Sequence, residues 1–129
     1  MVRLILLLIT LAAPVAAETP MTAKEFDTYA TGRTLTFGLA DGTVFGVEQY
    51  LPDRRVIWSR MDGTCTDGFW YAHKSNICFV YENDPEPKCW EIFRTANGIR
   101  ADFANQPGTT VLFEAIEDPA ALICGNLLS

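Results

Sequence analysis

The stretch ICFVYENDPEPKCW, residues 77–90, combines cysteines with acidic residues, which are the residue types of redox and metal sites. A redox dithiol favours the spacing Cys-x-x-Cys, and structural zinc usually takes closely spaced pairs of ligands. The four cysteines, Cys65, Cys78, Cys89 and Cys124, show neither spacing. In a small exported protein, an even number of cysteines favours structural disulfides. We therefore predict two disulfides, no metal site and no cofactor.

The pairing of these cysteines can be argued from hairpin geometry. If residues 83–87 form a loop, Cys78 and Cys89 lie diagonally on one face of two neighbouring strands. A modest change in register would bring them within disulfide reach. This favours Cys78–Cys89, which leaves Cys65–Cys124 to tie the C-terminal segment to an earlier strand. The nearest competing pattern, Cys65–Cys78 with Cys89–Cys124, stays open.

Acidic side chains and a single histidine are the remaining candidates for catalysis. Glu82, Asp84 and Glu86 form a cluster that could support carboxylate-dependent hydrolysis or bind calcium. The cluster lacks the regular ladder of calcium ligands, so we interpret it as a solvated turn. His73 has no Gly-x-Ser-x-Gly nucleophile to activate and is interpreted as an exposed turn residue. We predict no catalytic residue.

Aromatic side chains crowd the middle of the chain and are the candidates for a binding site. Such rings can line a pocket in the mouth of a barrel or form the contact surface for a partner protein. Core packing is their more frequent role. The residues that we predict to bind a ligand are Trp58, Trp70, Tyr71, Tyr81 and Trp90.

Short runs typical of β-strands follow one another through most of the chain, with turn residues between them. The runs are RTLTFGL, TVFGVEQY, RRVIWSR, GFWYA, NICFVYE, KCWEIFR, GIRADF and TTVLFEA. Asp-Gly and Asn-Gly pairs in several connections favour hairpins, and strands roughly 8 to 12 residues apart favour a sandwich or barrel. We predict a mainly β fold, an antiparallel meander of seven to eight short strands forming a small barrel or sandwich. Closure into a barrel would remove the exposed edges.

One short N-terminal helix is expected before the strands. Thr22 and Glu25 have the spacing of a capping box, and Met21 and Phe26 can form a hydrophobic staple around it. We expect the helix to span about residues 22–31, with its aromatic face on the core.

The C-terminal segment EDPAALICGNLLS carries a weaker helix signal. Pro119 follows an aspartate, as at a helix start, and Gly125 is placed to end a helix. We expect a short helical turn carrying Cys124.

The first 17 residues have the pattern of a secretory signal peptide. Arg3 precedes the apolar run of residues 4–11, and Val15 and Ala17 supply small residues for cleavage. The run is shorter than the roughly 20 residues of a membrane-spanning helix, so we expect no membrane anchor. Residues 1–17 are thus predicted to be cleaved, leaving residues 18–129 as a single disulfide-stabilised β domain that is periplasmic or secreted.

The charge of the chain bears on its partners. The formal net charge is −6, and the basic residues are scattered along the sequence. An acidic chain without a basic cluster is a poor candidate for binding nucleic acid or an anionic membrane.

Several strings together carry a resemblance. GRTLTF after a short helix, then DGTCTDGFW, NICFVYE and CWEIF, resemble a group of small exported bacterial proteins of unknown function, over about residues 29–103. The layout is also similar to lipocalin- and avidin-type barrels. The resemblance implies a β-meander fold and export, and it implies no activity.

We expect an exported, non-enzymatic binding module that takes a small molecule or an envelope protein as its partner, with enzyme inhibition as one version. A small carboxylate-dependent hydrolase and a structural envelope component are the alternatives.

The predicted leader can be tested by its cleavage site. When the full chain is produced in a bacterial host and recovered from the periplasm or medium, its N-terminal residue should be Glu18, because cleavage follows the small residues at the end of the leader. Intact-mass measurement checks this. A recovered protein that still begins at Met1 would contradict the predicted leader.

Overall fold

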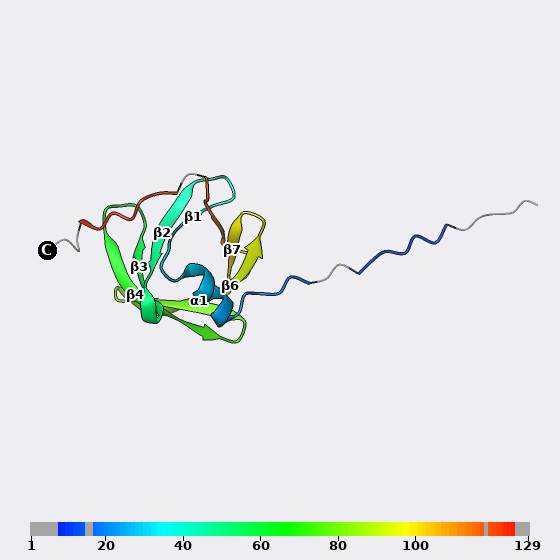
Figure 1. Ribbon diagram of the computed structural model, residues 1–129, viewed down its shortest axis with the longest axis horizontal. Helices are drawn as coiled ribbons and strands as arrows, with labels where there is room; N and C mark the ends of the chain where they lie inside the picture. Colours follow the sequence, from blue (N-terminus) through cyan, green and yellow to red (C-terminus); the bar gives the residue numbers. More distant parts are fainter. Residues whose placement is uncertain (1–7, 15–16, 118, 126–129) are drawn as a thin grey trace, which may run out of the picture.

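Eight antiparallel strands, paired in chain order, close into a barrel (Figure 1). The computed structural model describes residues 8–14, 17–117 and 119–125. The mainly β meander is confirmed, and the structure decides for the barrel. The strands are β1 (Thr34–Gly38), β2 (Val44–Tyr50), β3 (Arg55–Ser59), β4 (Cys65–His73), β5 (Asn76–Tyr81), β6 (Asp84–Thr95), β7 (Gly98–Phe103) and β8 (Val111–Glu114). A short 3-10 turn, η1 (Pro52–Arg54), precedes β3.

The two faces of the strands follow the alternation of the sequence, since successive side chains of a strand point to opposite sides. On β7, Ile99 and Ala101 are buried in the core. Arg100 and Asp102 alternate with them and point to the other face, where Arg100 Nε forms an ion pair of 2.9 Å with Asp102 Oδ1. Burial of one set and solvation of the other thus fix the register of this strand.

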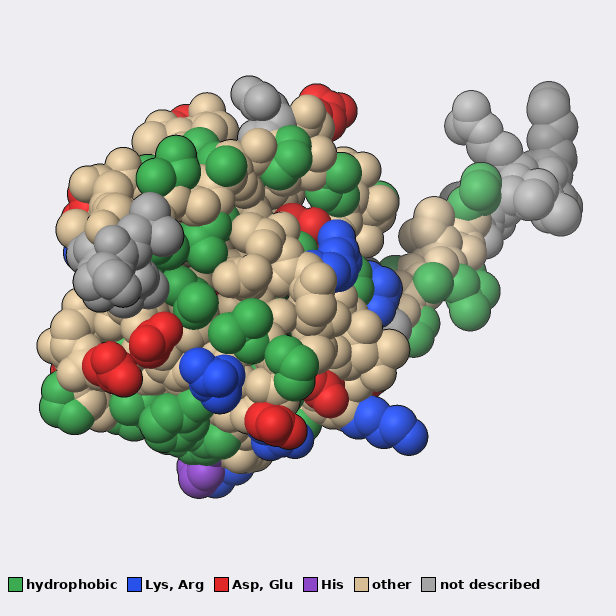
Figure 2. Space-filling model, turned by 60° about the vertical axis from the view of Figure 1, so that its left-hand side comes forward, with side chains coloured by type: hydrophobic (Ala, Val, Ile, Leu, Met, Phe, Trp, Pro, Cys, Tyr) green, Lys and Arg blue, Asp and Glu red, His purple; other side chains and the backbone are tan. Residues whose placement is uncertain are grey.

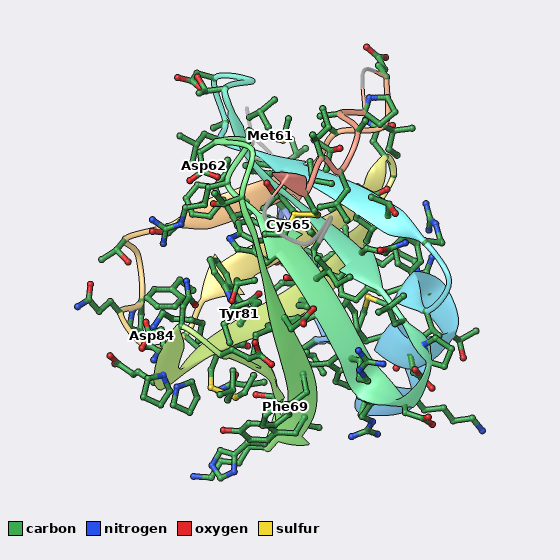
Figure 3. All side chains as sticks on the ribbon, turned by 90° about the vertical axis from the view of Figure 1, so that its left-hand side faces the viewer. Met61, Asp62, Cys65, Phe69, Tyr81 and Asp84 are labelled. Atoms are coloured by element: carbon green, nitrogen blue, oxygen red, sulfur yellow. A yellow bond between two sulfur atoms is a disulfide. The ribbon has the colours of Figure 1, made fainter. Side chains whose placement is uncertain are left out.

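Helix α1 (Ala23–Ala30) packs against one end of the barrel (Figures 1 and 3). Its capping box is formed by Thr22 and Glu25, as predicted. The ring of Phe26 is fully buried and makes edge contacts with three barrel rings. The centroids of these rings lie 5.5, 5.2 and 6.2 Å away, in Tyr50, Trp70 and Phe79. The helix therefore fills this end of the barrel with aromatic side chains.

Closure of the barrel depends on a short seam between β1 and β8, which pair at only two positions. A backbone hydrogen bond of 2.8 Å from Ala115 to Thr36 extends this seam. The Thr36 hydroxyl also accepts a 2.8 Å hydrogen bond from the backbone N–H of Ala120. From the helix, the Tyr29 hydroxyl donates to the Glu114 carboxylate at the end of β8. Helix, seam and tail thus support one another.

The tail differs from the prediction. Residues 119–124 form an irregular segment, and a 3-10 conformation is assigned only at Gly125, with the following residues outside the described part. Backbone groups of the tail bond to the barrel: Gly125, for example, donates to the Gly63 carbonyl over 2.9 Å. A disulfide between Cys65 and Cys124 holds the segment there. Tertiary pairing therefore replaces the expected helical turn.

The hairpin of β5 and β6 is tighter than expected. Its turn lies at residues 82–83 instead of residues 83–87, and β6 already begins at Asp84. An irregularity in the pairing near the end of β5 shifts the register, so that Cys78 directly opposes Cys89. These two cysteines form the second disulfide. The structure thus has the pairing that the sequence favoured.

The N-terminal segment projects away from the barrel (Figure 1). Residues 8–14 are exposed, while residues 1–7 and 15–16, which belong to the predicted signal peptide, lie outside the described part. Cleavage after residue 17 therefore stays a prediction. Over the described residues, no helix combines the length and the apolarity that a membrane span requires.

Charged side chains of both signs are interspersed on the face shown in Figure 2, with hydrophobic side chains between them. Basic residues, which are scattered along the sequence, are thus also scattered on this face.

Removal of the Phe26 ring should destabilise the barrel. Phe26→Ala is expected to lower the free energy of unfolding by about 3 to 5 kcal/mol, because it leaves a cavity among packed rings. Phe69→Ala is the matched control, since Phe69 is 50% exposed, and it should change stability by less than about 1 kcal/mol. Urea unfolding measures both. Equal effects of the two variants would show that α1 does not anchor the core.

Candidate functional site

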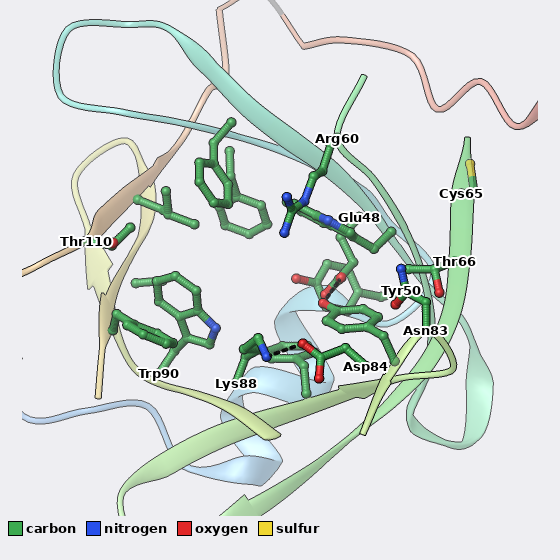
Figure 4. A pocket seen from close by; sticks show the side chains of 18 of the residues that line it. Glu48, Tyr50, Arg60, Cys65, Thr66, Asn83, Asp84, Lys88, Trp90 and Thr110 are labelled. Atoms are coloured by element: carbon green, nitrogen blue, oxygen red, sulfur yellow. Dashed lines mark hydrogen bonds and ion pairs between the residues drawn. The ribbon is translucent and has the colours of Figure 1, made fainter. Parts of the chain in front are cut away.

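A cavity of about 650 Å³ opens into the barrel at the end that α1 does not fill (Figure 4). All eight strands contribute to its lining. Figure 3 shows this end near Met61 and Asp62, with Phe69 at the other end and Tyr81 between them. The volume lies within the range of roughly 300 to 1,000 Å³ that is usual for small-molecule sites.

Aromatic rings form much of the cavity wall. Three pairs of rings contact each other there, with centroid distances of 6.4, 5.9 and 4.8 Å, and the first pair is stacked with its planes 9° apart. The pairs are Phe79–Tyr81, Phe45–Trp58 and Trp90–Phe103. Such walls offer flat apolar surface to a bound molecule.

Two glycines make room for two of these rings. A Cβ atom at Gly46 would lie 2.2 Å from the ring of Trp58. A Cβ atom at Gly68 would lie 2.7 Å from the ring of Tyr81 and 2.5 Å from a neighbouring backbone carbonyl. Since real Cβ atoms do not approach so closely, both positions require glycine, and the rings lie across the strands at these points.

A buried acid lies deep in the cavity. The Glu48 side chain comes from β2 and is only 2% exposed. The Tyr81 hydroxyl on β5 donates a hydrogen bond of 2.6 Å to its Oε2 atom, and the Tyr50 hydroxyl forms another. Burial raises the pKa of Glu48 to about 8, although hydrogen bonds from the two tyrosines oppose the rise. At neutral pH the carboxyl is therefore mostly protonated.

The two tyrosines respond to the same environment. Burial raises the pKa of Tyr50 and of Tyr81 well above 10.0, and the nearby Glu48 adds to both shifts. Both hydroxyls thus stay protonated and available as donors at physiological pH. Together the three residues form a compact polar group among the aromatic rings of the cavity.

Charged side chains lie nearer the mouth of the cavity (Figure 4). Lys88 Nζ forms an ion pair of 2.6 Å with Asp84, which holds the pKa of that carboxyl below its usual range. The Arg60 side chain points into the opening. Among the described residues, neither these nor any other Lys or Arg side chain forms an ion pair with Glu48.

Three of the five predicted aromatic residues line the cavity: Trp58, Tyr81 and Trp90. Trp70 is buried at the closed end, where its ring packs against Phe26 of α1. Tyr71 is paired with Cys78 and lies beside the half-exposed Phe69, with a centroid distance of 6.4 Å. The structure therefore brings three of these side chains together and leaves two outside the site.

The acidic cluster divides in the same way. Asp84 lines the cavity, while Glu82 and Glu86 are exposed. His73 is exposed at the turn between β4 and β5. In the described part of the chain, no group of three His, Cys, Asp or Glu residues is placed to hold a metal ion.

Sequence reasoning missed Glu48 and Tyr50. Their signal was the strand VFGVEQY, in which alternation places both residues on one face with Gly46. The hydrogen bond from Tyr81, which lies on β5 and not on a strand paired with β2, could not be inferred in this way.

The arrangement can bind and orient a small molecule. Aromatic walls accept an apolar body, while the Glu48 carboxyl can donate a hydrogen bond when protonated or hold a cation when ionised.

Comparisons of the chain with family models, with curated proteins and with solved structures found no match.

The pKa of Glu48 predicts how stability varies with pH. The folded state keeps a proton up to about pH 8, whereas the unfolded chain releases it near the ordinary value of 4.5. The contribution of Glu48 is therefore greatest below pH 4.5, falls by about 1 kcal/mol per pH unit above it and levels off above pH 8. Glu48→Gln should abolish this fall, which urea unfolding at several pH values measures.

Glu86→Gln makes the same chemical change at an exposed position and should leave the pH profile of the wild-type protein unchanged. If Glu48→Gln gave the wild-type slope as well, Glu48 would be ionised in the folded protein.

Proposed function

We propose that this protein is an exported binding protein that takes a small amphipathic molecule into its barrel. One observation carries the proposal: an open, aromatic-walled cavity of about 650 Å³ that contains a buried polar group around Glu48. An apolar body can contact the ring pairs of the wall, and a polar end can reach Glu48, Tyr50 or Tyr81. A few polar groups in an apolar pocket are what orients a ligand in most small-molecule sites.

The scaffold supports binding because its cavity is already formed. The closed sheet leaves the strands little freedom, and the Cys78–Cys89 and Cys65–Cys124 disulfides hold one hairpin and the tail. A preformed site loses less conformational entropy when a ligand binds.

The compartment is part of the proposal. Two disulfides are typical of a protein that folds in a non-reducing compartment. Together with the leader pattern of residues 1–17, they favour the periplasm or secretion.

A carboxylate-dependent hydrolase is the second candidate. It is favoured by the opposite pKa shifts of two carboxyls in one cavity, raised in Glu48 and lowered in Asp84. Such a pair can divide the roles of acid and base. The ion pair of Asp84 with Lys88 engages the would-be base, so binding remains the better-supported function.

Binding can be tested with N-phenyl-1-naphthylamine, an uncharged fluorescent probe of apolar pockets. The wild-type protein should bind it saturably with an increase in fluorescence. Thr66→Trp should weaken binding by about tenfold or more, because Thr66 lines the cavity and an indole ring would occupy its volume. Thr109→Trp adds the same ring at an exposed position and should leave the affinity unchanged.

Two results would contradict the proposal. One is absence of saturable probe binding to the folded protein. The other is equal affinity of the Thr66→Trp and Thr109→Trp variants, which would place the probe outside the lumen.

A further inference from the structure

We propose that the ligand of this cavity carries a protonated amine, and that its ammonium group binds at the Glu48 carboxylate. The inference rests on the proposed small-molecule function and names the chemical class of the ligand. Its basis is a buried acid that lies among aromatic rings in an open cavity and that has no cationic partner in the described part of the chain.

Among the described residues, no Lys or Arg side chain forms an ion pair with this acid. Only the hydroxyls of Tyr50 and Tyr81 favour the charged form of Glu48, while burial opposes it. A buried carboxylate is stabilised strongly when an opposite charge comes within about 4 to 6 Å. An ammonium group entering the cavity would supply the charge that the described residues do not.

Aromatic rings around the acid suit a cation as well. Trp58 is the cross-strand partner of Glu48, so the two inward side chains are neighbours. The stacked rings of Phe79 and Tyr81 come from β5, and the Tyr81 hydroxyl donates to the carboxyl itself. The negative face of an aromatic ring attracts an ammonium group, most strongly where water is excluded.

The charges at the mouth do not remove this preference, because they balance one another. Lys88 is paired with Asp84. Hydrogen bonds from Thr64 lower the pKa of Asp62, and the charge of Arg60 makes a smaller contribution. All four side chains, two basic and two acidic, line the cavity. The chain as a whole has a net charge of −6, which attracts cations over a longer range.

Binding of an amine should release a proton. Below about pH 8 the free protein holds a proton on Glu48, and the complex pairs an ammonium with a carboxylate. The Glu48 proton therefore passes to the buffer, while the amine keeps its own. Tyr50 and Tyr81 face Glu48 and stay neutral, and Glu114 acts on Tyr50 from β8. Affinity should rise about tenfold per pH unit up to pH 8 and then level off.

A matched series of probes tests the charge preference. Tryptamine is a cation, tryptophol is uncharged and indole-3-acetate is an anion, on the same indole body. Titration calorimetry of the full mature protein, in two buffers of different ionisation enthalpy, gives the affinity and the number of protons released. Tryptamine should bind at least about tenfold more tightly than either analogue at pH 8. It should release close to one proton at pH 6.5 and almost none at pH 9.

Two variants assign the effect to a side chain. Glu48→Gln should weaken tryptamine binding about ten- to a hundredfold, abolish proton release and change tryptophol affinity less than about threefold. Glu86→Gln removes an exposed carboxylate outside the lining and should behave as the wild-type protein. If Glu48→Gln does not fold, proton release by the wild-type protein decides.

The contrary results separate this inference from the proposed function. Tryptamine binding that is absent, no tighter than that of tryptophol, or free of proton release overturns the amine proposal. If N-phenyl-1-naphthylamine still binds in the lumen, small-molecule binding itself stands. If that probe does not bind either, both proposals fail.

Discussion

Closure of the sheet between β1 and β8 is the constraint on which the rest of the structure depends. The strands pair at only two positions, so the seam needs support from neighbouring groups. Thr36 bonds the tail at Ala120, and Tyr29 of α1 bonds Glu114 at the end of β8. An open sheet would have no lumen, and water would reach Glu48. The pKa of that carboxyl would then return toward its ordinary value, since burial is the main cause of the shift.

The difference between the two ends of the barrel leaves an open cavity at one of them. At one end, Phe26 brings α1 into contact with Tyr50, Trp70 and Phe79, and the rings fill the space. At the other end the lumen stays open over about 650 Å³. A tryptophan therefore packs the core or lines a cavity according to its distance from the helix, which explains why Trp70 and Trp58 have different roles.

Glu48 is a buried acid in a position where an apolar residue would make the protein more stable. A buried carboxyl must either lose its charge or find a partner, and both destabilise the fold relative to an apolar side chain of similar size. Local features that lower stability in an otherwise consistent structure tend to mark function. Here Tyr50 and Tyr81 reduce the penalty without removing it. The acid is thus explained by a ligand more readily than by packing.

Much of the fold could be predicted from the sequence, because its signals are local. A capping box four residues long starts α1 at Thr22, glycine and asparagine turns separate the strands, and alternation assigns the faces of β7. Local signals failed in the C-terminal tail, where hydrogen bonds to the barrel replace the helix that the sequence predicted.

Of the site, sequence reasoning found Trp58, Tyr81 and Trp90 as candidates and missed the buried acid Glu48. Glu48 and Tyr81 are 33 residues apart, and their contact depends on the register of four strands and on closure of all eight. Residue types determined which side chains could face inward; only the tertiary structure decided which of them meet, because burial and pKa are properties of the assembled lumen.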